Sequence, residues 1–290
     1  MTSQRAPRTM RVGDWTLTPV PDRSFRLDGG AMWGVVPDTM WRALTPPDES
    51  NTIPLALNCF LAERGDDVVL IEGGIGDRWN EKLTRIYRIT DDPGIEASLA
   101  AAGRKPSEIT SVVLTHCHWD HAGSLVVQDG EALRPRFPNA HHYAPEIEVS
   151  NALNPDPVRR ASYRADDVQP LLDAGLLSTY TGGSEVLPGI TPHVLGGHSD
   201  GSSVIRIGAD DDGAIFWGDV VPTTHHIQPA YIMAYDIDAA RSFEARAEWI
   251  AKAADAGWLG CFYHDPDRPF GYLERDGKRY RCTAPDQMTV

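Results

Sequence analysis

Short apolar runs alternate with polar turns along most of the chain, and each run has the length of one buried strand. Residues 56–62 and 68–71 flank a turn at Gly65, and residues 204–207 and 214–217 flank a turn at Gly213. Apolar runs of about four to eight residues bounded by Gly and Asp are typical of strands joined by tight turns. The pattern therefore predicts two hairpins.

Other stretches alternate differently or follow a helical period. Residues 15–20 alternate like an edge strand, residues 95–102 predict a helix that Gly103 ends, and residues 118–125 predict a turn entering a short helix. The clearest amphipathic helix covers residues 238–256, with Gly257 as its stop. Its predicted apolar stripe consists of Phe243, Ala247, Ile250 and Ala254. Strands and helices thus share the chain, which predicts an α/β fold.

Two segments fit neither pattern. Residues 28–52 are rich in Gly, Pro and large apolar side chains such as Met32, Trp33 and Trp41. A long segment without regular structure inside a compact domain is usually functional. We expect either an apolar wall over a binding site or a packed surface loop, and such a loop is also what a homodimer contact would look like. Residues 146–177 predict a polar helical insertion.

The most informative stretch is His116-Cys117-His118-Trp119-Asp120-His121, which directly follows the apolar run 112–114. Because that run predicts a short buried strand, the polar groups are delivered into a loop at its end. Imidazole and carboxylate groups are zinc ligands. His116 and His118 project to one side of an extended backbone, whereas Asp120 and His121 follow a turn and can face a second ion. One segment can therefore supply ligands to two metal ions.

This stretch resembles the His-x-His-x-Asp-His signature of the metallo-β-lactamase superfamily, over about residues 55 to 265. In that family a histidine, an aspartate and a histidine follow in order, and the matching residues here are His198, Asp219 and His264. The resemblance implies a four-layer αβ/βα sandwich with a dinuclear metal site. By that match the first metal is held by His116, His118 and His198, the second by Asp120, His121 and His264, and Asp219 bridges the two.

Three positions depart from the family pattern. The family usually has Asp-Thr-Gly after its early strand, but this chain has Glu72-Gly73-Gly74, and we expect the longer Glu72 to support the ligands without binding metal. A second histidine that often follows the third ligand is replaced by Ser202. Cys117 occupies a variable position, where we expect it to face away from the metals. All seven ligands remain, but groups around ligands tune metal affinity.

Composition and charge narrow the function further. The chain has 290 residues, 41% hydrophobic and 23% charged, and we expect a single domain over 1–290 with a flexible tail at 1–11. The net charge of -14 disfavours nucleic acid and anionic membranes, which argues against the nuclease branches of the family. No run approaches the roughly 20 apolar residues of a membrane span. The four cysteines form no paired motif, which predicts reduced thiols and a cytoplasmic location.

The implied metal pair defines the chemistry. Two neighbouring divalent ions lower the pKa of a water between them, and the resulting hydroxide is the nucleophile. Zinc is the first choice because the ligands are nitrogen and oxygen, while manganese, iron or cobalt can occupy the same ligands. Asp120 is the candidate catalytic residue, which orients that water and carries a proton to the leaving group.

The resemblance narrows the substrate class but leaves alternatives open. True β-lactamases either have a cysteine ligand or lack the bridging aspartate. This chain has no cysteine at a ligand position and keeps the bridging Asp219, so β-lactamase activity is not expected as its main activity. Glyoxalase II-like thioesterases share the seven ligands but carry a basic C-terminal patch. This chain has only Arg268, Lys278 and Arg279 in the corresponding region, which is a weak match to that patch. The apolar N-terminal segment and the helical insertion resemble quorum-quenching lactonases and organophosphate hydrolases. We expect a small apolar ester or lactone substrate of the N-acyl homoserine lactone type, with phosphotriester hydrolysis as the runner-up.

The same fold could also be a non-enzymatic metal-binding module or a redox protein. A non-enzymatic metal-binding module would be expected to have lost ligands, and none is missing. Di-iron redox relatives replace the second histidine of the signature by glutamate, whereas His118 is present here. Hydrolysis is therefore favoured over both.

Several other polar and aromatic residues have open roles. We expect strand or surface positions for His141, His142 and His193. Pocket-lining and supporting roles are open for His225 and His226, and core and substrate-wall roles are open for Tyr231, Met233 and Tyr235. Helical spacing predicts a solvated face, or one partner for a substrate carboxylate, for Arg159, Arg160 and Arg164.

Overall fold

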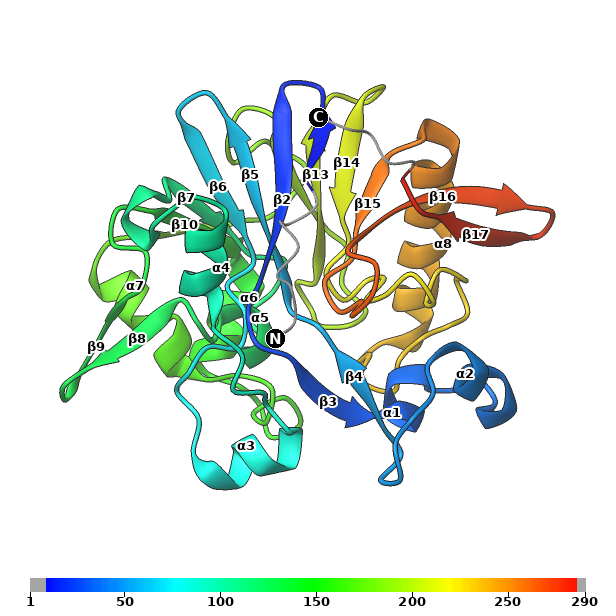
Figure 1. The fold of residues 1–290 in the computed structure, drawn as a ribbon, viewed down its shortest axis with the longest axis horizontal. Helices are drawn as coiled ribbons and strands as arrows, with labels where there is room; N and C mark the ends of the chain where they lie inside the picture. Colours follow the sequence, from blue (N-terminus) through cyan, green and yellow to red (C-terminus); the bar gives the residue numbers. More distant parts are fainter. Residues whose placement is uncertain (1–8, 286–290) are drawn as a thin grey trace.

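The computed structural model describes residues 9–285 and contains two mixed β-sheets that face each other (Figure 1). The first sheet has seven strands in the order β1-β2-β5-β6-β7-β10-β11, with bounds Met10–Val12, Trp15–Pro21, Asn58–Arg64, Asp67–Ile71, Ser111–Val113, His141–Pro145 and Leu177–Tyr180. The second has six, β12 to β17 in order, with bounds Ile190–Val194, Ser203–Gly208, Gly213–Phe216, Leu259–Cys261, Phe270–Asp276 and Arg279–Thr283. Two small ribbons pair β3 (Phe25–Asp28) with β4 (Thr52–Leu55) and β8 (Val126–Asp129) with β9 (Ala132–Pro135).

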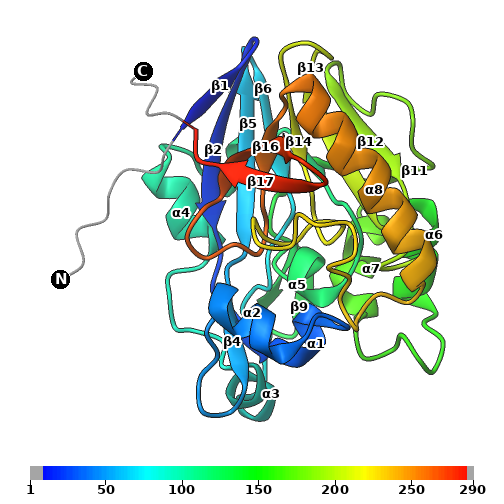
Figure 2. The same cartoon turned by 90° about the vertical axis from the view of Figure 1, so that its right-hand side faces the viewer.

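The sheets pack through aromatic side chains and are covered by helices outside. The ring of Phe60 on β5 lies 5.6 Å from Phe216 on β14 and 5.1 Å from Phe270 on β16, centroid to centroid. Helix α8 (Ala239–Ala256) packs on β16 and α4 (Ile95–Ala101) on β2, on opposite sides of the molecule (Figure 2). This is the αβ/βα sandwich that the family resemblance implies, so the predicted fold is confirmed.

The remaining helices are short. Their bounds are α1 Gly29–Trp33, α2 Asp38–Leu44, α3 Glu81–Tyr87, α5 Trp119–Ala122, α6 Glu146–Leu153 and α7 Gln169–Asp173, with 3-10 turns at Pro106–Glu108 and Ala165–Asp167. Between residues 9 and 285, no helix combines the length and the apolar character needed to cross a bilayer.

Most local predictions are confirmed, but the prediction that residues 15–20 form an edge strand is wrong. The predicted hairpins are β5–β6 and β13–β14, and α8 ends at Gly257, whose φ of 66° is left-handed. Strand β2 is not at the edge, because β1 pairs on its outer side. Strand β1 (Met10–Val12) overlaps the end of the expected tail 1–11, so residues 10 and 11 are ordered, whereas residues 1–8 are outside the described part of the chain.

The segment 28–52 was also predicted wrongly as structureless. It contains α1 and α2, enclosed by β3 and β4. Asp28 caps α1 by accepting a hydrogen bond from the Ala31 backbone N–H at 2.8 Å. Helices of five and seven residues are too short to establish a hydrophobic period. The segment is therefore an ordered unit at one end of the sandwich.

The predicted apolar stripe of α8 is confirmed at Ile250, which is fully buried, but the centre of the buried face is shifted by one position. Phe243 is 45% exposed, and the buried face consists of Ser242, Ala245, Arg246, Trp249, Ile250 and Ala253. Arg246 is fully buried because its guanidinium donates to the backbone carbonyls of Val220, His226, Gln228 and Pro229. A charged residue at the centre of the buried face breaks the apolar period on which the prediction relied.

The insertion 146–177 is helical only at α6, the second 3-10 turn and α7. Residues 154–164 between them form turns, so the helical spacing of the arginines does not apply. Arg159 pairs with Asp200, and Arg164 pairs with Asp167 at 2.8 Å. The prediction of a solvated basic face is therefore wrong for these two residues.

Candidate metal centre

Four loops meet at one end of the two sheets, and each follows a strand. They follow β7, β12, β14 and β15, and they carry the seven predicted ligands. The loop after β14 approaches the loop after β7 so closely that a Cβ on Gly218 would lie 2.7 Å from the Thr115 hydroxyl. Gly218 also has a φ of 50°, which glycine adopts readily. This glycine lets Asp219 reach the histidines of the other sheet.

The donor atoms of the predicted ligands gather in two groups, and Glu72 forms a further possible group with His116 and His121. Those of His116, His118 and His198 all lie within 4.8 Å of one another, and the same holds for Asp120, His121 and His264. The groups contain the same residues that the family resemblance assigns to two metals. Each residue offers an imidazole nitrogen or a carboxylate oxygen, which are zinc-type donors.

Asp219 lies between the groups and turns one oxygen to each. Its Oδ2 lies 3.1 Å from His198 Nε2 and 4.0 Å from His116 Nε2. Its Oδ1 lies 3.1 Å from His264 Nε2 and 3.3 Å from His121 Nε2. This is the placement that a bridging carboxylate requires.

The histidines present these nitrogens because other groups bind the opposite side of their rings. His198 Nδ1 lies 3.0 Å from Asp236 Oδ1, and His264 Nδ1 lies 2.9 Å from the carbonyl oxygen of Ala56. An acceptor at Nδ1 favours the tautomer with the proton there, which leaves the lone pair on Nε2. Both rings therefore direct Nε2 at Asp219 and the space beside it.

Glu72 supports two further histidines. Its Oε1 accepts hydrogen bonds from the Thr115 backbone N–H, at 2.9 Å, and from the Thr115 hydroxyl, which lies 3.0 Å from His116 Nδ1. Its Oε2 lies 3.5 Å from His121 Nδ1, on the side of that ring opposite to Asp219. Glu72 has a φ of 68°, a conformation that costs free energy for a non-glycine residue and concentrates at functional sites.

Buried polar atoms in this centre lack partners. Among residues 9–285, buried side-chain atoms without a hydrogen bond include Glu72 Oε2, His116 Nε2, both ring nitrogens of His121 and Asp219 Oδ1. An unpaired buried polar atom costs about 1–3 kcal/mol. A cation within each group would satisfy His116 Nε2, His121 Nε2 and Asp219 Oδ1, so the residues fit a pair of bound metal ions, while His121 Nδ1 and Glu72 Oε2 face each other at 3.5 Å.

The pKa shifts agree with a site built for cations. Burial lowers the pKa of His116 and of His118 well below the usual histidine value, so both rings are neutral. Burial also opposes protonation of His121, but Asp219 and Glu72 outweigh it and raise the pKa of His121 well above its usual value. Negative charge therefore accumulates around His121 and attracts positive charge.

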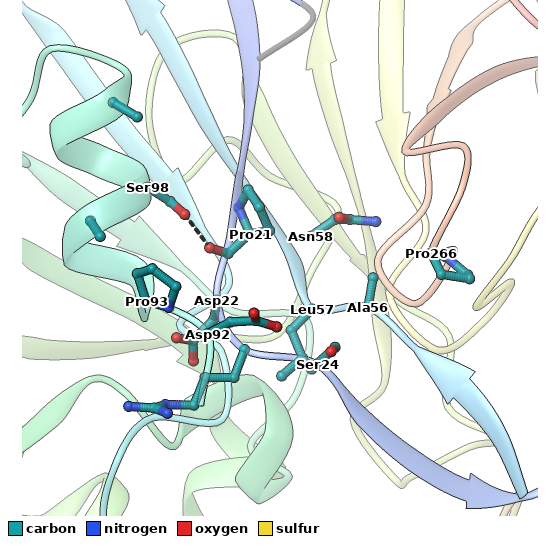
Figure 3. Close-up of a pocket in the computed structure, with 13 residues that line it drawn as sticks. Pro21, Asp22, Ser24, Ala56, Leu57, Asn58, Asp92, Pro93, Ser98 and Pro266 are labelled. Atoms are coloured by element: carbon teal, nitrogen blue, oxygen red, sulfur yellow. Dashed lines mark hydrogen bonds between the residues drawn. The ribbon is translucent and has the colours of Figure 1, made fainter. Parts of the chain in front are cut away.

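A pocket of about 330 Å³ opens over the two groups. Its floor includes His118, Asp120, His198, Asp219 and His264, and its walls are Leu27, Met32, Tyr87, Trp119, Ala161, Ser162, Met233 and Tyr235. A second cavity, of about 360 Å³, lies between α4 and the start of β5 and is lined by Asp22, Asn58 and Ser98 but by none of the seven predicted ligands (Figure 3). The pocket over the metal centre is thus the one suited to chemistry.

The expected apolar wall is only partly confirmed. Of the three residues named for it, Met32 lines the pocket, but Trp33 and Trp41 do not. Trp33 is fully buried, where its ring stacks on His226 at 4.0 Å and its N–H donates to the Thr45 hydroxyl at 2.6 Å. Trp33 and Trp41 belong to the packing that holds α1 in place.

Some of the other residues whose roles were left open line the pocket, and others belong to the packing around it. Met233 and Tyr235 line the pocket, whereas Tyr231 packs against Trp33 at 5.5 Å between ring centroids. His225 and His226 are not among the pocket-lining residues, and His226 Nε2 lies 3.1 Å from the Met32 carbonyl oxygen. His141 and His142 lie in β10 and His193 in β12, as expected.

Sequence reasoning missed several residues of this centre. Asp236, which binds His198, lies 38 positions away from it in a loop before α8. Leu27, Tyr87 and Trp119 line the pocket from three different elements. No local motif marks Asp236, Leu27 or Tyr87, so only the tertiary arrangement reveals them, and Trp119 lies inside the ligand motif at a position that the motif leaves variable.

Comparison with known proteins identifies the family of this chain. The family described as the Metallo-beta-lactamase superfamily matches residues 52–259. An N-acyl homoserine lactonase of Bacillus thuringiensis is 24% identical over 183 residues, which cover 60% of this chain and 65% of that protein. The chain thus spans about two thirds of the length of the curated relatives it matches.

Solved structures extend the likeness to nearly the whole chain. A probable metal-dependent hydrolase from Staphylococcus aureus has a TM-score of 0.86 and 29% identity, covering 97% of this chain and 100% of its own. The hydrolase AbOPH has a TM-score of 0.81 and 22% identity, with coverages of 99% and 100%. The dizinc quorum-quenching lactonase AidC has a TM-score of 0.79 and 18% identity, with coverages of 98% and 99%. The family match over residues 52–259 shows that the chain belongs to the metallo-beta-lactamase superfamily.

Proposed function

We propose that this chain is a hydrolase that binds two divalent ions, zinc in the first instance, and cleaves a small apolar lactone or ester of the N-acyl homoserine lactone type. The observation that carries the proposal is Asp219, whose two oxygens face two separate donor groups beneath one pocket. By this proposal His116, His118 and His198 hold one ion, and Asp120, His121 and His264 hold the other.

In this proposal the metal ions and Asp120 have different roles in the reaction. When bound, two such ions activate water and polarise the carbonyl group of a substrate. Asp120 Oδ2 lies 3.6 Å from His264 Nε2, and Asp120 also lines the pocket, so it can touch both an ion and the reacting atoms. Its free oxygen can accept a proton from the attacking water and return it to the leaving alkoxide. Its main chain is held by the Tyr263 hydroxyl, which donates to the Asp120 carbonyl at 2.5 Å.

The pocket supports a neutral, partly apolar substrate. Its walls are mostly aliphatic and aromatic, and its lining contains no Lys or Arg. A substrate with an acyl chain can bury that chain there, at about 0.8 kcal/mol per methylene. The lactonase names among the relatives point the same way. A phosphotriester is also neutral and stays the second candidate, while a glutathione thioester is anionic and is disfavoured.

Metal analysis and a substrate panel test the proposal. Protein prepared without chelator should contain about two divalent ions per chain, and Asp219→Ala should contain fewer. The panel should include an acyl homoserine lactone, a phosphotriester, a thioester and a β-lactam, with the lactone hydrolysed fastest. A reproducible content of one ion that Asp219→Ala leaves unchanged would refute the dinuclear site. A lactone hydrolysed more slowly than the other three would refute the substrate class.

A further inference from the structure

One buried carboxylate outside the seven predicted ligands joins two of the loops that carry them. Glu148 lies on α6 and is fully buried. Its Oε2 accepts a hydrogen bond from the Cys117 backbone N–H at 3.2 Å, and Cys117 lies between His116 and His118. Its Oε1 accepts one from the Gly201 backbone N–H at 2.8 Å, in the loop of His198. A single side chain therefore spans both loops of the first histidine group.

Two neighbouring contacts strengthen the connection. The Tyr163 hydroxyl donates to Glu148 Oε2 at 2.9 Å, and the Tyr163 ring packs edge-to-face on His118 with centroids 4.9 Å apart. A Cβ on Gly201 would lie 2.6 Å from the Glu148 side chain, so α6 approaches that loop as closely as glycine permits. The cluster thus fixes both the backbone beside His118 and one face of its ring.

The chemistry of Glu148 explains why a carboxylate is present. All three of its donors are neutral, and among the described residues no Lys, Arg or His forms a salt bridge with it. Burying a charge without a cationic partner is costly. A carboxylate accepts several hydrogen bonds and offers no donor of its own, which an amide or hydroxyl cannot match. The free-energy cost of burying the Glu148 carboxylate is explained if its three hydrogen bonds set the geometry of the metal centre.

We propose that Glu148 is a positioning residue that sets the spacing of His116, His118 and His198 and thereby the affinity of that group for its metal ion. The inference rests on the proposed function, because it assigns that group to a metal. It assigns the polar insertion a role in building the metal centre. Among the described residues, no hydrogen bond or salt bridge joins Glu148 to Asp120, His121 or His264, so the second group should not depend on it.

Glu148→Gln is the informative substitution because it keeps the size and one acceptor oxygen. The amide NH₂ must then face either Cys117 or Gly201, so one loop loses its contact. Removal of such supporting contacts typically costs about 10- to 100-fold in metal affinity. Asp167→Asn is the matched control, since Asp167 is equally buried in the same insertion but pairs with Arg78 and Arg164.

A double-mutant cycle assigns the effect to one ion, with zinc affinity measured by competition against a chromophoric chelator. In a His264→Ala background, which weakens the second group, Glu148→Gln should lower the affinity of the remaining ion about 10- to 100-fold. In a His198→Ala background, which weakens the first group, it should change affinity less than about twofold. The thermal midpoint of the metal-free protein should match that of Asp167→Asn within a few degrees.

Two results would overturn the inference. One is an unchanged affinity in the His264→Ala background. The other is an equal loss in both backgrounds together with a lower thermal midpoint of the metal-free protein, which would make Glu148 a general folding residue. Wild-type protein that fails to bind two zinc ions would instead refute the proposed function, and this inference with it.

Discussion

Met32 is the pocket residue whose truncation should change how the enzyme responds to acyl-chain length. It is 2% exposed, lies on α1 and lines the pocket over the metal centre. Met32→Ala removes the part of the side chain that forms this wall and leaves space that water can enter. Trp33, its neighbour on α1, is buried against His226 and does not line the pocket. The two residues should therefore give different results.

The size of the effect follows from apolar burial. Each methylene buried by a growing acyl chain contributes about 0.8 kcal/mol, which is about fourfold in kcat/KM because about 1.36 kcal/mol is tenfold. The pocket is open to solvent on one side, so about two- to fourfold per methylene is expected until the pocket is full. Losing one wall should reduce this to about twofold or less in Met32→Ala.

The assay is kcat/KM for N-acyl homoserine lactones of increasing chain length at full metal occupancy. Met32→Leu is the conservative control and should keep the slope, because it preserves an apolar side chain of similar volume. Trp33→Phe should lower the thermal midpoint, since it removes the hydrogen bond to Thr45, and should also keep the slope. A wild-type series that is flat, or a Met32→Ala series as steep as wild type, would show that Met32 does not contact the chain.

Three further substitutions test the roles around the metals. Asp120→Asn should lower kcat more than it raises KM, because it affects water and the leaving group in the transition state; wild-type kcat with two ions bound would remove Asp120 from the mechanism. Glu72→Asp should keep both ions by elemental analysis but weaken one, since the shorter side chain cannot reach both Thr115 and His121; loss of a whole ion would make Glu72 a ligand. Asp236→Asn should lower zinc affinity about tenfold in chelator competition, because it weakens the acceptor at His198 Nδ1, and an unchanged affinity would show that this contact does not support the metal.

The sequence was most informative where the chemistry is local. His116 to His121 lie in one segment after one strand, and each later match also follows a short apolar run. The C-terminal ends of strands that run in the same direction lie at one edge of a sheet, as those of β12, β14 and β15 do, so residues that follow such strands lie close in space. The fold followed from the same residues, because the motif is tied to a known arrangement of strands.

The supporting residues could not be found in this way. Glu148 and Asp236 bind the ligand loops from elements that lie 31 and 38 positions from their partners Cys117 and His198. In the sequence, a buried carboxylate on a polar helix cannot be distinguished from a solvent-exposed one. Tertiary contacts decide which residues are buried. For the same reason the prediction that Phe243 lies on the buried face of α8 was wrong, because Arg246 lies on that face instead.

The charge of the centre gives an independent argument about the substrate. The two donor groups are surrounded by the carboxylates of Glu72, Asp120, Glu148, Asp219 and Asp236. Burial lowers the pKa of His116 and His118, whereas at His121 and His198 these carboxylates outweigh burial and raise the pKa of both rings. Two divalent ions would offset nearly all of this negative charge, and without them so much buried charge would be costly. Little positive charge is then left to attract an anion, and the pocket lining adds no Lys or Arg. A neutral lactone or phosphotriester can enter such a site without electrostatic cost, whereas an anionic thioester meets no counter-charge, so the electrostatics and the apolar walls favour the same class of substrate.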